Sequence, residues 1–297
     1  VALTTGCSTV SLPESAKLAK AGGAASSELQ GYYVSSRTAL PSILEMEVLR
    51  SSLEPGVSPP STEMIASINR VELSLKHRAR IASKLNSLYS SLHELSVTDY
   101  AGGVEKSIEG LNSEISGFAS AINVQNPLSD STSGMIGNIF GLLVQEQQKK
   151  RVAKANIIVV KQLEAIGFLL EKDSDAVRAI RRVTSTQTEL TSIALWYTGT
   201  VSAKGMLSKY VASDGMQLVN NDTEFTSRNQ KLRDAVPAII RHRLSNIREA
   251  EDARYEAFGR AIEELTARHR EIAEGAPADI ASVIILAGNL NDLLAER

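Results

Sequence analysis

The sequence predicts an all-α protein, an elongated bundle of about six or seven long antiparallel helices with coiled-coil-like packing. The first observation is composition, because aromatic residues make up only 4% of the 297 residues and only 8 residues are proline. A β-sandwich or barrel normally needs more aromatic and turn residues. The second is spacing, because apolar residues recur every three or four positions over long segments, as on one helix face. The third is that no strand-like alternation extends beyond about four residues.

Residues 31–297 are expected to form one helical-bundle domain, since 43% of the chain is hydrophobic and can build a core. Residues 1–30 are expected to be a signal-peptide remnant followed by a flexible tether. The segment after Cys7 is rich in serine, alanine and glycine, including Gly22-Gly23 and Ser26-Ser27. Such segments order poorly unless they dock onto another surface.

Helical spacing begins at residue 13 and continues to about residue 52, with Pro41 as a break or kink because proline lacks the backbone N–H. After Pro59-Pro60, the next helix is predicted over residues 62–95. Its apolar positions keep a seven-residue repeat, which is typical of a face packed against partner helices. The two series are Met64, Val71, Leu85 and Leu92, and Ile68, Leu75, Ala82 and Tyr89. Arg78 occupies a position in the first series, so this face is predicted to contain one polar layer.

Further helices are predicted over residues 103–124, 134–172, 174–213, 222–274 and 281–294. Turn-forming residues at 125–133 and 275–279 separate some of them. Pro237 is expected to kink the helix that contains it. Trp196 lies in a charge-free stretch and is expected to supply core volume, since a buried indole more often does this than bind a ligand.

The N-terminus carries one short motif, Leu3-Thr4-Thr5-Gly6-Cys7, which ends at the only cysteine of the chain. It resembles the cleavage box of bacterial lipoproteins, although Thr4 stands where leucine is commonest. The resemblance implies that Cys7 carries the lipid, that the mature chain begins there and that the lipid tethers it to a membrane. Ser8 in the following position resembles the preference for the outer membrane, which implies its periplasmic face. No later apolar run reaches the roughly 20 residues of a membrane span.

Catalytic and metal-binding patterns do not emerge from the sequence. The four histidines are His77, His93, His242 and His269, and none lies in the spacing of a di-iron or zinc motif. Each is therefore expected on a solvated helix surface. We expect no enzyme activity, no cofactor and no metal, although an enzyme with a site assembled from distant residues stays open. A formal net charge of −2 argues against a nucleic-acid partner.

The segment 134–144 is apolar, contains no charged residue and includes three glycines, which allow another backbone to approach closely. It is a candidate for membrane or partner contact through Met135, Ile136, Ile139, Phe140, Leu142 and Leu143. The arrangement resembles, in architecture only, the membrane-seeking hairpins of cytolysin-type α-helical pore formers. The simpler interpretation, which we favour, is a helix start packed inside the bundle.

Together these observations predict a non-enzymatic lipoprotein of the bacterial cell envelope that acts as a structural or protein-interaction module. Its partners would be another envelope protein or a second copy of itself, and the membrane through the lipid at Cys7. The alternative is an α-helical pore-forming or membrane-perturbing protein that uses residues 134–144.

Overall fold

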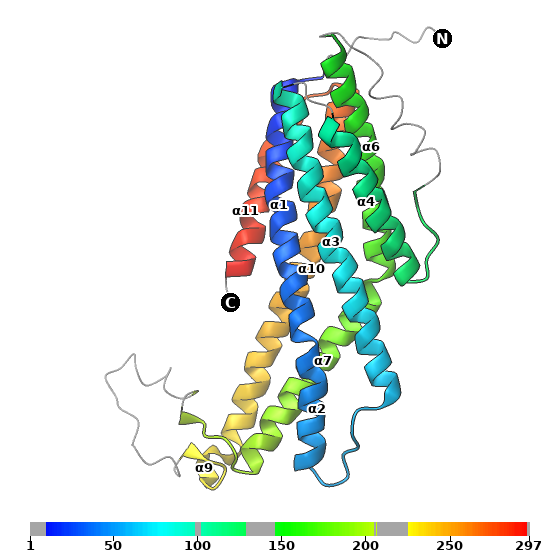
Figure 1. Ribbon diagram of the computed structural model, residues 1–297. Helices are drawn as coiled ribbons and strands as arrows, with labels where there is room; N and C mark the ends of the chain where they lie inside the picture. Colours follow the sequence, from blue (N-terminus) through cyan, green and yellow to red (C-terminus); the bar gives the residue numbers. More distant parts are fainter. Residues whose placement is uncertain (1–9, 99–101, 129–145, 205, 207–224, 296–297) are drawn as a thin grey trace, which may run out of the picture. The chain divides into compact units, whose positions relative to one another are not determined.

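The computed structural model describes residues 10–98, 102–128, 146–204, 206 and 225–295. Within these residues all regular secondary structure is helical (Figure 1), which confirms the all-α class. The helices are α1 (Leu12–Ala39), α2 (Pro41–Leu53), α3 (Thr62–Thr98), α4 (Gly102–Ala121), α6 (Glu146–Lys172), α7 (Ser174–Tyr197), α9 (Gln230–Arg233), α10 (Ala235–Glu274) and α11 (Ile280–Ala295). No helix in the described part of the chain is long and apolar enough to cross a membrane.

The chain divides into two compact units, each assembled from separate segments. Unit 1 comprises residues 1–37, 72–175 and 254–297, and unit 2 comprises residues 38–71 and 176–253. The expected single domain over residues 31–297 stays a prediction.

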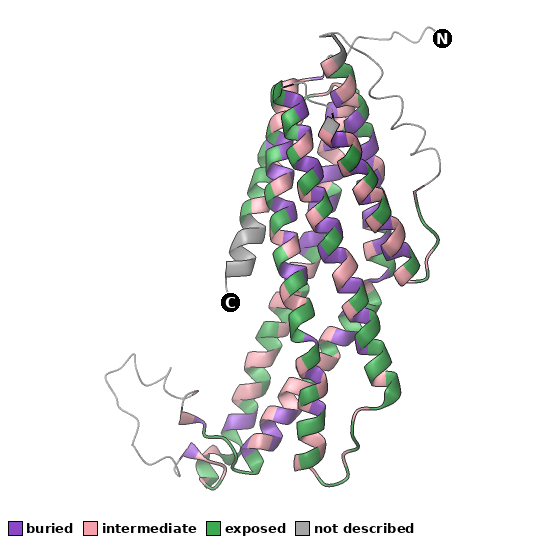
Figure 2. Cartoon of the chain, viewed as in Figure 1, coloured by how far each residue is buried: buried purple, intermediate pink, exposed green. Residues whose placement is uncertain are grey.

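Unit 1 is a helical bundle around one apolar core. Its segments of α1, α3, α4, α6 and α10 lie side by side in Figure 1, and buried residues follow one face of each helix in Figure 2. Burying one leucine, isoleucine or phenylalanine side chain contributes about 1.5–3 kcal/mol, so these stripes drive the assembly. The core includes Leu18, Leu85, Leu92, Ile108, Ile115, Phe118, Val159, Leu163, Leu169, Ile262 and Leu265.

The seven-residue repeat predicted for α3 is confirmed. Every member of the two apolar series is buried except Met64, which is half-buried. Arg78 is buried as well, at 1% exposure, so the predicted polar layer lies inside the bundle.

Residues 12–30 differ from the expected flexible tether, because they form most of α1 and pack into the core of unit 1. The small side chains that suggested flexibility allow a close approach of α1 to α3. At Gly22 a Cβ atom would lie only 2.5 Å from the ring of Tyr89, so only glycine fits there. The tether prediction is therefore wrong for residues 12–30, while residues 1–9 lie outside the described part of the chain.

Two prolines and one glycine define helix ends. Pro41 is the first residue of α2, as the predicted break between two helices requires. Pro237 lies in the first turn of α10, where its missing N–H would have no partner in any case. The expected interior kink at Pro237 is therefore wrong. α7 ends at Tyr197, earlier than residue 213, because Gly199 adopts φ +73° and the chain turns.

Unit 2 contains a small core around Trp196, which is 1% exposed and packs with Ala203 and Val236. The indole Nε1–H donates to the backbone oxygen of Arg233 at 3.1 Å. The expected role of Trp196 as core volume is confirmed. α7 also packs on α2, where the Thr191 hydroxyl donates to the backbone oxygen of Met46 at 3.1 Å.

Candidate functional site

The residues that the sequence singled out for function lie outside the described part of the chain. These are Cys7, the expected lipidation site, and the candidate contact residues Met135, Ile136, Ile139, Phe140, Leu142 and Leu143. The candidate surfaces below therefore come from other residues, which the structure places and the sequence did not single out.

The C-terminal helix α11 is held to unit 1 by one face. Ile280 and Val283 are buried in the core, and the Ser282 hydroxyl donates to a carboxylate oxygen of Glu264 on α10. That carboxylate also accepts from Arg268 Nε at 3.0 Å, so the contact joins an ion pair on α10. α11 is therefore anchored by two buried side chains and one charge-assisted hydrogen bond.

The outer face of α11 is apolar too where its side chains are described, at residues 280–285 and 287–288. Ile284 is 57% exposed and Ile285 is 62% exposed, and the sequence from Ile280 to Asn291 contains no charged residue. A surface helix normally carries charged or polar residues on its outer face, whereas a helix that is apolar all round is normally covered. The outer face of α11 therefore has the composition of a contact surface.

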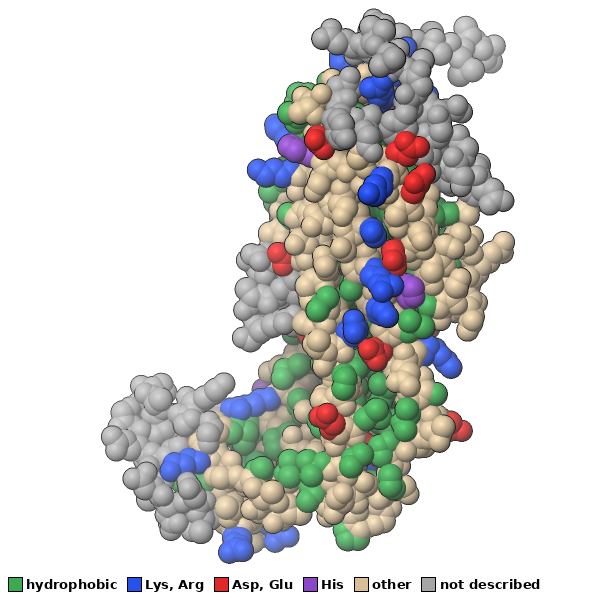
Figure 3. Space-filling view, viewed as in Figure 1, with side chains coloured by type: hydrophobic (Ala, Val, Ile, Leu, Met, Phe, Trp, Pro, Cys, Tyr) green, Lys and Arg blue, Asp and Glu red, His purple; other side chains and the backbone are tan. Residues whose placement is uncertain are grey.

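On α2 in unit 2 the usual distribution of side chains is also reversed, with a charged residue buried and apolar residues exposed. Glu47 is buried and accepts from Arg50 Nη2 at 3.1 Å, while the next two residues, Val48 and Leu49, are 52% and 41% exposed. On the face drawn in Figure 3, hydrophobic side chains gather on unit 2 around α2. Exposed apolar side chains that cluster, rather than occur singly, mark surfaces that contact other molecules.

The interior of unit 1 contains a polar layer, formed by Ser74, Arg78, Asp173 and Tyr255. Asp173 Oδ2 accepts from Arg78 Nη2 at 2.7 Å, from Arg78 Nε at 3.2 Å and from the Ser74 hydroxyl. The Tyr255 hydroxyl donates to the backbone oxygen of Leu170 at 3.3 Å and accepts from Arg78 Nη1 at 3.4 Å. The layer therefore ties α3 to α10 and to the end of α6.

Aromatic rings surround the guanidinium of Arg78. Its Cζ lies 5.8, 5.7 and 5.6 Å from the ring centroids of Tyr33, Phe118 and Tyr255, which is within cation–π range. Burial alone would lower the pKa of Arg78, but Tyr33, Tyr255 and Asp173 outweigh it and raise that pKa above its ordinary value. Burial in turn raises the pKa of Tyr33. The layer thus holds a permanent buried cation opposite one carboxylate.

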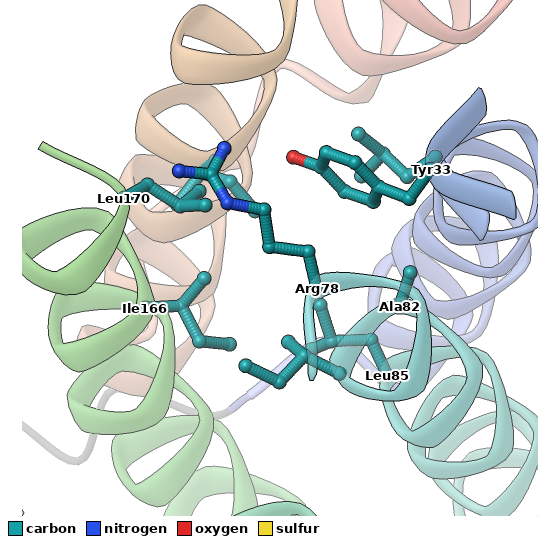
Figure 4. A pocket seen from close by; sticks show the side chains of 9 residues that line it. Tyr33, Arg78, Ala82, Leu85, Ile166 and Leu170 are labelled. Atoms are coloured by element: carbon teal, nitrogen blue, oxygen red, sulfur yellow. The ribbon is translucent and has the colours of Figure 1, made fainter. Parts of the chain in front are cut away.

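A cavity of about 10 Å³ lies beside Arg78, lined by Leu29, Tyr33, Ile81, Ala82, Leu85, Ile166, Leu170 and Ile262 (Figure 4). Such a volume has room for about one water molecule. The geometry around Arg78 is therefore that of a packed structural layer, with space for no larger ligand in this cavity.

A second buried polar group, the histidine network, consists of His269, Asn156 and Tyr89. His269 Nδ1 donates to Asn156 Oδ1 at 2.5 Å, and the Tyr89 hydroxyl donates to His269 Nε2 at 3.2 Å. The two rings stack with their centroids 5.5 Å apart. His269 is 1% exposed, so its expected place on a helix surface is wrong, whereas His93 and His242 are exposed as expected. His77 is half-buried beside Glu114.

The buried positions of Asp173 and His269 were not predicted from the sequence, although both residues occupy core positions of apolar repeats. Asp173 falls in the heptad series Val152, Val159, Ile166, Asp173 and Ile180, all of which are buried. His269 fills the gap in the α10 stripe between Leu265 and Ile272. A polar residue at such a position is the signal that could have identified both.

Within the described residues, no three histidine, cysteine, aspartate or glutamate side chains group so that they could hold a metal ion. Comparisons with protein-family models, with curated proteins and with solved structures find no match to this chain.

Proposed function

We propose that this protein is a non-enzymatic lipoprotein of the bacterial cell envelope, tethered through Cys7, and that it acts as a structural or protein-interaction module. The observation that carries the interaction role is the outer face of α11, where Ile284 and Ile285 are 57% and 62% exposed within the stretch Ile280 to Asn291, which contains no charged residue. The exposed Val48 and Leu49 on α2 support the same role.

The tether rests on the sequence at residues 3–7 and is tested by labelling. Expressed in a bacterial host with its native leader, the protein is expected to incorporate a palmitate analogue and to fractionate with the outer membrane. Cys7→Ala should abolish the label, because this is the only cysteine of the chain. Labelling that survives Cys7→Ala would contradict the localisation.

The interaction role is tested by a photo-crosslinking amino acid placed at position 284 in living cells. A protein adduct is expected from this position, either with another envelope protein or with a second copy of the chain. The matched control is position 260 on α10, where Arg260 is exposed but lies on a charged surface beside Glu256. Equal adducts from both positions, or none from 284, would contradict the proposal.

The alternative is a pore-forming or membrane-perturbing protein, and it rests on the uncharged apolar segment 134–144. Liposome leakage separates the two functions. If the segment acts on membranes, Leu143→Asp should abolish leakage from dye-loaded liposomes while leaving thermal stability nearly unchanged. If it packs in the bundle, the unlipidated parent should cause no leakage, and Leu143→Asp should lower the thermal midpoint because it buries an unpaired carboxylate.

A further inference from the structure

The histidine network lies where four helices of unit 1 meet. His269 is on α10, Asn156 on α6 and Tyr89 on α3, and the ring of Tyr89 rests against Gly22 of α1. Asn156 Nδ2 donates to the backbone oxygen of Val152 at 2.7 Å, which orients its Oδ1 toward the histidine. Both ring nitrogens of His269 are therefore used, one as donor and one as acceptor, which is the pattern of a neutral imidazole.

The charged side chains near the network on the four helices are paired with one another or exposed to solvent. On α10, Arg268 pairs with Glu264 and Glu271, and the exposed Arg270 pairs with Glu164 of α6. On the other helices, the titratable residues nearest in sequence to Gly22, Tyr89 and Asn156 are exposed: Lys20 on α1, His93 on α3 and Lys154 on α6. His269 is bonded to an amide and a phenol, and neither offers a negative charge to an imidazolium. Burial also raises the pKa of Tyr89, so the phenol stays a neutral donor.

We propose that the histidine network is an acid-sensitive switch, and that proton uptake by His269 opens the contact of α10 with α3 and α6. A second proton on the ring turns Nε2 into a donor, so the bond that Nε2 accepts from the Tyr89 hydroxyl is lost, and the phenol must turn its own hydrogen away to accept instead. The imidazolium is then buried without a counter-charge, which the unfolded or opened chain avoids by exposing it to water.

The direction in which stability changes with pH follows from the lowered pKa of His269. Burial lowers the pKa of His269 from its ordinary 6.5 to about 3 in the folded chain. The folded state therefore keeps its full stability above pH 6.5 and loses it as the pH falls toward 3. Between pH 8 and pH 5 this one group should raise the unfolding equilibrium constant about 30-fold.

The experiment compares unfolding by urea at pH 8 and pH 5 for the full chain and three variants. His269→Gln removes the titrating group but keeps an amide that can bond Asn156. The rise of about 30-fold in the unfolding equilibrium constant between pH 8 and pH 5 that His269 contributes should therefore be absent from this variant. Asn156→Asp places a carboxylate beside the ring, so acid should destabilise this variant less than the parent. His93→Gln changes an exposed histidine on α3 and should follow the parent.

Ring NMR signals of the unmodified chain provide a readout that does not depend on any variant folding. In the folded chain His269 should keep the signature of the neutral Nδ1–H tautomer down to pH 5. A His269→Gln variant with the same pH dependence as the parent would overturn the proposal. So would a His269 ring that becomes protonated above pH 5 while α10 stays packed.

Discussion

Removal of the buried carboxylate Asp173 is the sharpest test of how the polar layer contributes to stability. The side chain of Arg78 is 0% exposed and that of Asp173 is 6% exposed, so Asp173→Ala leaves a guanidinium in the core without its carboxylate. The Ser74 hydroxyl loses its acceptor as well. Breaking one side of a buried ion pair costs about 3–5 kcal/mol, because the remaining charge stays desolvated.

Urea unfolding followed by circular dichroism at 222 nm measures this loss. With an m value of about 3 kcal/mol/M, the midpoint of the transition should fall by roughly 1–2 M. The double variant Arg78→Met with Asp173→Leu should recover most of the loss, because apolar side chains of similar volume can replace a buried pair. Glu256→Ala on α10, which breaks an exposed pair with Arg260, should change the midpoint little. An Asp173→Ala variant that loses less than about 1 kcal/mol would refute the reasoning, since Arg78 would then have another source of solvation.

Three further changes test individual contacts. Gly22→Ala should destabilise unit 1 by about 1–3 kcal/mol, because its Cβ would lie 2.5 Å from the ring of Tyr89. Gly31→Ala on the same helix should instead be neutral or stabilise by about 0.5–1 kcal/mol, because a Cβ there meets nothing within 4 Å. Comparing the thermal unfolding of these two glycine variants separates the effect of packing from that of helix propensity. Trp196→Phe should destabilise by about 1–3 kcal/mol in urea, because the backbone oxygen of Arg233 loses a buried donor; an unchanged midpoint would contradict this.

The helices of this protein could be predicted from the sequence because apolar periodicity is a local signal. The repeat on α3 identified the buried face and even the polar position at Arg78. Helix ends were less predictable where a single backbone conformation decides them. Gly199 ends α7 by adopting a positive φ, and Pro237 begins α10 where an interior kink was expected.

The long-range hydrogen-bond partners of Arg78 and His269 could not be predicted from local sequence patterns. Asp173 lies between the helices predicted over residues 134–172 and 174–213, and only the folded bundle reveals that its carboxylate lies inside and accepts from Arg78, which is 95 residues away in sequence. His269 pairs with Asn156 and Tyr89 over even longer separations. The glycine pair at residues 22–23 indicates flexibility when considered alone, yet the same absence of side chains lets α1 pack tightly against Tyr89.

The polar layer and the histidine network also favour one register of the helices of unit 1 over others. Ile262 and Leu265 of α10 are buried, and the buried apolar positions of α3 repeat every three or four residues, so a slide of α10 by one turn would offer them a similar apolar stripe. The same slide would separate Tyr255 from Arg78 and His269 from Tyr89 at once. Each buried polar group left without a partner costs about 1–3 kcal/mol, which is enough to discriminate between registers that the apolar contacts barely distinguish. Hydrophobic burial thus drives the association of the helices, whereas the polar layer and the histidine network determine the register in which they associate.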